Sequence, residues 1–240
     1  MERLPQRPAV GPRKTVMLSA GHGTGSNIGN VGVHGQLEQD TTLALATELA
    51  ERLRSLDRFD VVLAREGAER PSYAQRVEEA ERLGVDVLVE LHTDSRGPYE
   101  VWARTPERVV YRNDHDPGFS VLFRDKGPLA EAHASLARTI AHSLMETGFP
   151  AYDGASYGRR YARDATPGAF RDRRSLYMLR TPRMPAVLVE LHHALDYEES
   201  LRWREPRVRE AFAWSMADAL TRYLYPSPWE SGGQPQEGRL

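Results

Sequence analysis

Three polar side chains in this sequence follow or end apolar runs of the kind that form buried strands. His22 comes just after the first such run, His92 ends the third, and Glu190 lies near the end of a later one. An unpaired polar group is costly to bury, so each of these residues needs a partner or a chemical role. Because ligands collect at the carboxyl ends of parallel strands, we expect the three side chains to meet at one edge of a sheet.

A fourth polar residue, Glu38, lies at the start of a predicted helix over 37–56. Successive helical residues are rotated by about 100°, which places Glu38 on the same face as Leu45 and Leu49 and directs its carboxylate toward the core. Taken alone, a carboxylate there favours the positive end of the helix dipole, a contribution of about 0.3–1 kcal/mol. Taken with two histidines, it completes a set of two imidazoles and one carboxylate, which is typical of a catalytic zinc site with an open position for water.

Glu190 has two interpretations. In a zinc site it is the general base: the metal lowers the pKa of water toward about 7, and a nearby carboxylate can take that proton and pass it to a leaving amine, as in amide hydrolysis. Alternatively, Glu190 is a strand-end carboxylate paired with Arg174 or Arg180. The sequence has no HExxH spacing to support a metal, so the residue pattern alone leaves both interpretations open.

Predicted strands and helices alternate along the chain. Apolar runs predict strands over 15–19, 59–64, 85–92 and 186–191, and amphipathic patterns predict helices over 37–56, 72–83, 129–147 and 207–224. We therefore predict one α/β domain over 15–225, with a mainly parallel twisted sheet flanked by helices on both faces. The Pro- and Gly-rich ends predict flexible tails over 1–14 and 226–240, and an irregular stretch is expected over 94–126.

The composition excludes several classes of protein. The 240 residues include 32 basic and 34 acidic side chains, a net charge of −2, which argues against a general affinity for nucleic acid. There is no cysteine, so any metal must be bound by histidine and carboxylates. No apolar run approaches the roughly 18 residues of a membrane span, and none near the N-terminus resembles a signal peptide. As written, the sequence predicts a cytoplasmic protein, or one of the cell envelope if it is exported by another route or its start is misassigned.

Several segments match a known family in the correct order. They are VMLSAGHG in the first strand and turn, the Gly-rich loop into Glu38, FDVVLARE, Tyr73–Arg76, VDVLVELHTD and LYMLRTPRMPAVLVE, and together they cover most of 15–205. On these segments the sequence resembles the zinc-dependent N-acetylmuramoyl-L-alanine amidases of the Amidase_3 type.

This resemblance implies a site, a substrate and a fold. By it, His22, Glu38 and His92 are the ligands of one Zn²⁺ ion, and Glu190 is the catalytic carboxylate. The implied substrate is peptidoglycan or its muropeptide fragments, in which the family cleaves the amide between the lactyl group of N-acetylmuramic acid and L-alanine. The implied fold is an α/β sheet of about six strands with helices on both sides.

The sequence departs from the family pattern around the site. Ser19-Ala20 replaces the usual Asp-Pro before the Gly-His-Gly turn, and Leu191-His192-His193 replaces the usual Thr-Gly-Phe after the catalytic glutamate. The segments 94–126 and 150–174 are unlike the short connections of a minimal amidase. We therefore expect the wall of the substrate pocket to differ from that of the family.

Two residues in or near these departures are candidates for substrate binding. Arg174 is a candidate for stem-peptide carboxylates, because a guanidinium can bind a carboxylate in a bidentate manner. His193, close to Glu190, is a candidate for stabilising an oxyanion or orienting the carboxylate. The stretch Gly154–Gly158 matches G-x-S-x-G, but it follows a predicted helix and not a strand, so we interpret it as a mobile or substrate-facing loop.

Two other functions remain open from the sequence. A related metal amidohydrolase for small N-acyl amino acids, of the N-formylglutamate type, would use the same polar residues in a smaller pocket. A catalytically silent cell-wall-binding domain would keep the fold alone, and the presence of all four polar residues argues against it. The oligomeric state does not follow from the sequence.

Overall fold

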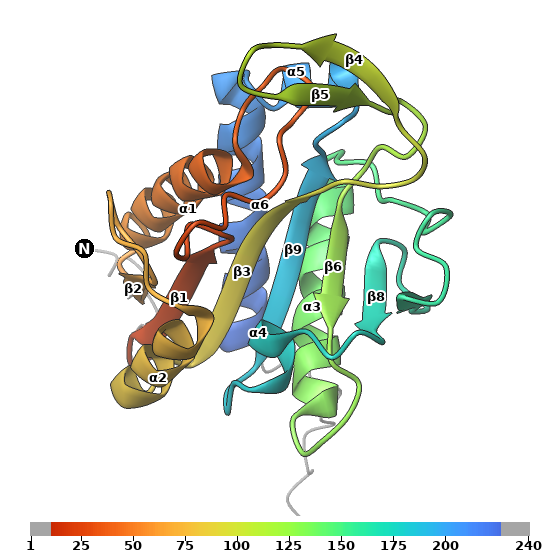
Figure 1. Cartoon of the computed structure of the whole chain (residues 1–240). Helices are drawn as coiled ribbons and strands as arrows, with labels where there is room; N and C mark the ends of the chain where they lie inside the picture. Colours follow the sequence, from red (N-terminus) through yellow and green to blue (C-terminus); the bar gives the residue numbers. More distant parts are fainter. Residues whose placement is uncertain (1–10, 227–240) are drawn as a thin grey trace, which may run out of the picture.

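A seven-stranded sheet forms the centre of the protein (Figure 1). The computed structural model describes residues 11–226, so residues 1–10 and 227–240 of the predicted tails lie outside the described residues, whereas Lys14, assigned to the N-terminal tail, begins the first strand. The strands are β1 (Lys14–Ala20), β2 (Phe59–Leu63), β3 (Val87–Asp94), β6 (Ser120–Phe123), β7 (Tyr161–Arg163), β8 (Ala169–Asp172) and β9 (Ala186–His193). Their order across the sheet is β2-β1-β3-β9-β6-β8-β7.

The strands are parallel in the half of the sheet that contains the predicted site. β2, β1, β3 and β9 all run in one direction. β6 is antiparallel to β9, β8 is parallel to β6, and β7 is antiparallel to β8. The prediction of a mainly parallel sheet in a single α/β domain is confirmed, with seven strands where about six were expected.

Helices cover both faces of the sheet. α1 (Glu38–Arg54), α3 (Ala130–Glu146) and α6 (Pro206–Leu224) share one apolar core with β1, β3 and β9. α2 (Tyr73–Leu83) and the short α4 (Tyr177–Arg180) pack on the opposite face, and α5 (Tyr197–Arg202) follows β9. The four predicted helices all begin and end within two residues of their expected bounds. Among residues 11–226, no helix has the length and apolar character needed to cross a membrane.

The stretch predicted to be irregular, 94–126, contains three strands, so that prediction was wrong. β4 (Glu100–Arg104) and β5 (Val109–Arg112) form a hairpin at the top of Figure 1, beyond the carboxyl ends of β3 and β9. β6 has only the four residues SVLF, too few to show a period, and it is a strand because it is buried between β9 and β8. β7 and β8 are equally short and escaped prediction for the same reason.

The pairing of β3 with β9 determines which side chains share a face. His92 is paired directly with Glu190, and because side chains alternate along a strand, Glu90 lies on the same face as His92. Leu88, at the next position on this face, packs with α2 and α4. The register shifts after His92, so that Asp94 is paired with His193. The predicted catalytic residues therefore lie on the face covered by α2 and α4.

Candidate metal centre

His22 lies in a tight turn directly after β1. Its own φ of 59° is in the left-handed region, which is unusual for a non-glycine residue and is held here by the neighbouring loop. Gly29 in that loop must be a glycine, because its φ is +77° and a Cβ would lie 2.5 Å from an oxygen of Glu38. The glycine-rich segment thus brings the loop against the first turn of α1, where Glu38 begins the helix.

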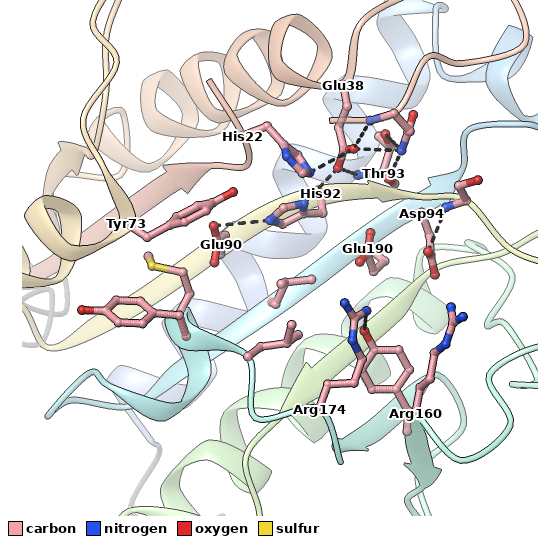
Figure 2. A pocket seen from close by; sticks show the side chains of 17 residues that line it. His22, Glu38, Tyr73, Glu90, His92, Thr93, Asp94, Arg160, Arg174 and Glu190 are labelled. Carbon is pink, nitrogen blue, oxygen red and sulfur yellow. Dashed lines mark hydrogen bonds and ion pairs between the residues drawn. The ribbon is translucent and has the colours of Figure 1, made fainter. Parts of the chain in front are cut away.

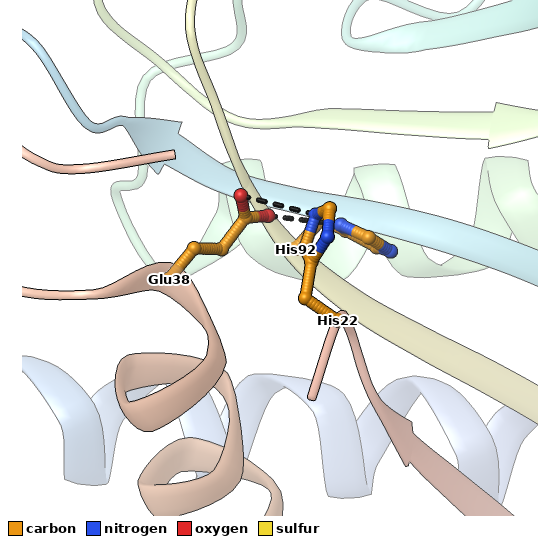
Figure 3. A group of neighbouring side chains, drawn as sticks. All are labelled: His22, Glu38 and His92. Atoms are coloured by element: carbon orange, nitrogen blue, oxygen red, sulfur yellow. Dashed lines mark hydrogen bonds and ion pairs between the residues drawn. The ribbon is translucent and has the colours of Figure 1, made fainter. Parts of the chain in front are cut away.

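The structure brings the three predicted ligands together (Figure 3). Glu38 Oε2 lies 3.1 Å from His22 Nε2, and Glu38 Oε1 lies 2.9 Å from His92 Nδ1. All three ligand atoms lie within 4.8 Å of one another. Two imidazole nitrogens and a carboxylate oxygen this close together could bind a single metal ion.

Glu38 is an ionised, fully hydrogen-bonded carboxylate. It is 4% exposed, and it accepts hydrogen bonds from the backbone N–H groups of Asn30 and Thr93 and from the Asn30 side chain. Burial raises its pKa, but the contacts with His22 and His92 outweigh burial and hold the pKa well below its usual range. A carboxylate in this state is a metal ligand that needs no deprotonation.

In each histidine, the ring nitrogen that does not face Glu38 lies near an oxygen that can accept a hydrogen bond. His22 Nδ1 lies 2.9 Å from Asn27 Oδ1, an oxygen that also accepts from the backbone N–H of Gly29. His92 Nε2 lies 3.3 Å from Glu90 Oε1. An amide oxygen and a carboxylate only accept, so a proton on each of these nitrogens would leave the opposite nitrogen of each ring, His22 Nε2 and His92 Nδ1, to bind a cation beside Glu38. Two imidazole nitrogens and one carboxylate converging in this way fit a divalent cation.

The negative charges around His92 also favour a cation at this position. Burial lowers the pKa of His92, but the flanking carboxylates Glu38 and Glu90 outweigh burial and raise that pKa well above its usual value. The two carboxylates therefore favour a positive charge at this imidazole. Either a second proton or a metal ion on Nδ1 meets that demand.

Glu190 lies in the same cavity as the three ligands (Figure 2). The cavity has a volume of about 360 Å³, and Glu190 extends into it from β9, next to His92 of β3. Its Oε2 is buried and has no hydrogen-bond partner in the described structure. Burial, followed by the negative charge of Asp94, raises the pKa of Glu190 well above its usual value. A carboxyl group with a raised pKa beside a metal site is suited to taking and returning a proton.

Asp94 is a charged neighbour of Glu190 that the sequence did not reveal as a site residue. Its Oδ2 accepts from Arg96 Nε and from the Tyr157 hydroxyl, both at 2.7 Å. Burial raises the pKa of Asp94, but Arg96 and the hydrogen bonds outweigh burial and lower it. Asp94 therefore stays ionised and favours the protonated form of Glu190.

The opposite wall of the cavity contains two guanidinium groups, those of Arg160 and Arg174 (Figure 2). Arg174 Nη1 donates to the Tyr161 hydroxyl at 2.9 Å. Within the described part of the chain, neither arginine forms an ion pair with a carboxylate, and Glu190 is not paired with Arg174 or Arg180. Both guanidiniums are therefore available to a ligand in the cavity.

The two histidines after Glu190, His192 and His193, do not line the cavity. The register shift directs His192 to the opposite face of the sheet, where its ring stacks on Trp203 with 5.2 Å between centroids. His193 is fully buried, its Nδ1 lies 3.3 Å from the carbonyl oxygen of Asp94, and it does not line the cavity. The structure thus brings Arg174 to the cavity but not His193.

Two buried residues that support the site were not identified from the sequence. Arg76 of α2 donates to the Ser19 hydroxyl and to the carbonyl oxygens of Ala20 and His22, which fixes the turn that presents His22. Glu90 contacts His92. The position of Glu90 two residues before His92 in a predicted strand was a usable signal, because alternate residues share a face.

Comparisons with known proteins identify the family of the chain. The Amidase_3 family model, described as N-acetylmuramoyl-L-alanine amidase, matches residues 16–222. The N-acetylmuramoyl-L-alanine amidase AmiA of Salmonella typhimurium is 25% identical over 239 residues, covering 92% of this chain and 80% of AmiA, and AmiA of Escherichia coli is 24% identical with the same coverage.

Solved structures of amidases share the fold. The catalytic domain of CwlV from Bacillus (Paenibacillus) polymyxa var. colistinus superposes with a TM-score of 0.66 at 23% identity, covering 88% of this chain and 98% of that domain. The N-acetylmuramoyl-L-alanine amidase from Clostridium difficile 630 gives a TM-score of 0.69 at 20% identity, with 92% and 99% covered. Since the family model spans most of the 240 residues, the chain belongs to the Amidase_3 family of N-acetylmuramoyl-L-alanine amidases.

Proposed function

We propose that this amidase uses one zinc ion, held by His22, Glu38 and His92, and Glu190 as general base and acid. Its substrate is the amide between N-acetylmuramic acid and L-alanine in peptidoglycan or muropeptides. The observation that carries the proposal is the convergence of three ligand atoms within 4.8 Å in a cavity that also contains a buried, unpaired carboxyl group.

The donor set supports zinc over harder cations. Two imidazole nitrogens and one carboxylate oxygen are ligands that zinc accepts in its three-ligand catalytic sites, whereas magnesium and calcium prefer sites made of oxygens. A bound zinc ion supplies Lewis-acid chemistry, because it polarises the amide carbonyl and makes water acidic enough to lose a proton near neutral pH.

Glu190 moves the proton in this proposal. In its ionised form, the carboxylate takes a proton from the attacking water. It then holds that proton on a carboxyl oxygen in a site where burial and Asp94 favour the protonated form. The same group gives the proton to the nitrogen of L-alanine as the amide bond breaks, so that the amine leaves neutral.

The arginines of the facing wall bind the substrate in this proposal. Arg174 is oriented by the Tyr161 hydroxyl at 2.9 Å and has no carboxylate partner among the described residues. A guanidinium at this position suits a carboxylate of the stem peptide, on the leaving-group side of the amide. Arg160 lines the same wall and adds a second positive charge.

Product analysis tests the substrate assignment. We expect purified sacculi or muropeptides to release stem peptides with a free L-alanine amino group, identified by mass spectrometry, while small N-acyl amino acids stay intact in a parallel incubation. Turnover of N-acyl amino acids without release of stem peptides would contradict the peptidoglycan assignment and favour a small-substrate amidohydrolase.

A further inference from the structure

Glu90 is a buried carboxylate that the proposed reaction does not use. It lies on β3 two residues before His92, is 1% exposed and lines the cavity. Its Oε1 lies 3.3 Å from His92 Nε2, an ion-pair distance, and neither oxygen has a hydrogen-bond partner among residues 11–226. A buried charge without partners is destabilising, so this residue needs a physical explanation.

No other cation in the described structure pairs with Glu90. Arg76, a buried guanidinium on α2, directs its donors to the turn that contains His22. The only ion-pair contact of Glu90 in this part of the chain is with His92. Figure 2 shows the two side chains in contact on the cavity floor, with Glu190 on the other side of the imidazole.

The contact is with the nitrogen that does not face the ligand set. His92 Nδ1 points at Glu38 Oε1 at 2.9 Å, and Nε2 points at Glu90. A carboxylate on Nε2 cannot share the metal with Nδ1 of the same ring, and it is separated by the imidazole from a water held near Nδ1. This geometry excludes Glu90 as a fourth ligand and as the base, and leaves it acting through His92.

We propose that Glu90 is the positioning residue of His92, an inference that rests on the proposed zinc site. Across the 3.3 Å contact, the Glu90 carboxylate attracts the proton of His92 to Nε2 and so favours the tautomer whose Nδ1 lone pair faces the metal position. Its negative charge also makes the imidazole a stronger ligand, as carboxylate partners of metal-bound histidines do. His22 has only a neutral amide in the equivalent place, Asn27 Oδ1 at 2.9 Å. The two histidine ligands are therefore supported unequally.

The test measures zinc affinity separately from catalysis. Glu90→Gln keeps the size and an acceptor oxygen but removes the charge, and Glu90→Leu removes both. We expect the zinc Kd, measured by chelator competition, to rise about 10-fold in the Gln variant and up to about 100-fold in the Leu variant, the range seen when partners of metal-bound histidines are removed. With saturating zinc, kcat of both variants should return close to the wild-type value. Glu190→Gln is the matched control in the same cavity, with activity lost and zinc Kd unchanged.

A spectroscopic readout reports the tautomer directly. In zinc-loaded wild-type protein, ¹⁵N shifts of the His92 ring should show a protonated Nε2, and this signal should weaken or broaden in the Leu variant. If Leu prevents folding, the Gln variant alone decides the question.

The outcomes separate this inference from the proposed function. Wild-type protein that binds no zinc would overturn both. Wild-type protein that binds zinc, with a Glu90→Gln variant of equal Kd, would overturn the role of Glu90 alone. A variant that keeps its zinc Kd but loses kcat at saturating zinc would make Glu90 a catalytic residue and contradict the positioning role.

Discussion

Replacing Glu190 with glutamine separates the base from the metal ligands. Glutamine has nearly the same shape, cannot take a proton from water, and leaves His22, Glu38 and His92 in place. Because Glu190 Oε2 has no hydrogen-bond partner in residues 11–226, the substitution breaks no such bond at that oxygen. We therefore expect a folded, zinc-binding and inactive protein.

The size of the loss follows from the role assigned to Glu190. A positioned general acid or base contributes about 10²- to 10⁴-fold to a rate, which corresponds to about 2.7–5.4 kcal/mol of transition-state stabilisation at about 1.4 kcal/mol per tenfold. We expect the upper half of this range, because one residue both takes the proton and returns it. Burial already favours the neutral carboxyl, so a neutral amide should leave the free energy of unfolding at pH 7 unchanged or slightly higher.

The assay follows kcat on a purified muropeptide by chromatography, with zinc content and urea unfolding measured on the same preparation. Glu198→Gln, the same substitution at an exposed position of α5, is the control and should behave as wild type. A Glu190→Gln protein that retains kcat would show that the base lies elsewhere. One that loses zinc would show that Glu190 is a ligand.

Four further predictions follow from the site. His22→Ala removes one of three ligands, so both zinc content and activity should be lost, as measured by elemental analysis and stem-peptide release. Arg174→Gln should raise KM for muropeptides with free stem carboxylates and leave kcat nearly unchanged, whereas Arg159→Gln, which does not line the metal cavity, should alter neither. Arg76→Met removes four hydrogen bonds, to Pro71, Ser19, Ala20 and His22, and should lower the free energy of unfolding by about 2 kcal/mol or more in urea titrations. The pKa of Glu38 in the folded state lies below its unfolded value of about 4.3. In metal-free protein, the ionised Glu38 therefore stabilises the fold above about pH 4.3, and this stabilisation is lost as the pH falls through the folded-state pKa. Urea titrations between pH 3 and 6 should show the free energy of unfolding decreasing toward low pH, and Glu38→Gln should reduce this pH dependence.

Much of the fold followed from periodicity. The helices α1, α2, α3 and α6 are amphipathic over 11 to 19 residues, long enough for a period of 3.6 to be recognised. β6, β7 and β8 have three or four residues each, and only their neighbours in the sheet make them strands. The hairpin of β4 and β5 is exposed throughout most of its length and has no apolar alternation to recognise.

The sequence was sufficient to predict the site residues that lie at the carboxyl ends of strands. His22, His92 and Glu190 follow or end apolar runs, and the parallel pairing of their strands brings them to one edge of the sheet, where Glu38 joins them. The bulge in the pairing of β3 with β9 was not predictable from composition. It moves His192 to the other face and buries His193, although both directly follow Glu190 in sequence.

Zinc content tests the central claim most directly. The purified 240-residue chain should contain about one zinc per molecule by elemental analysis, lose stem-peptide release from sacculi when a chelator removes that zinc, and recover release when zinc is restored. Release of stem peptides by protein that contains no metal and is insensitive to chelator would contradict a reaction built on His22, Glu38 and His92.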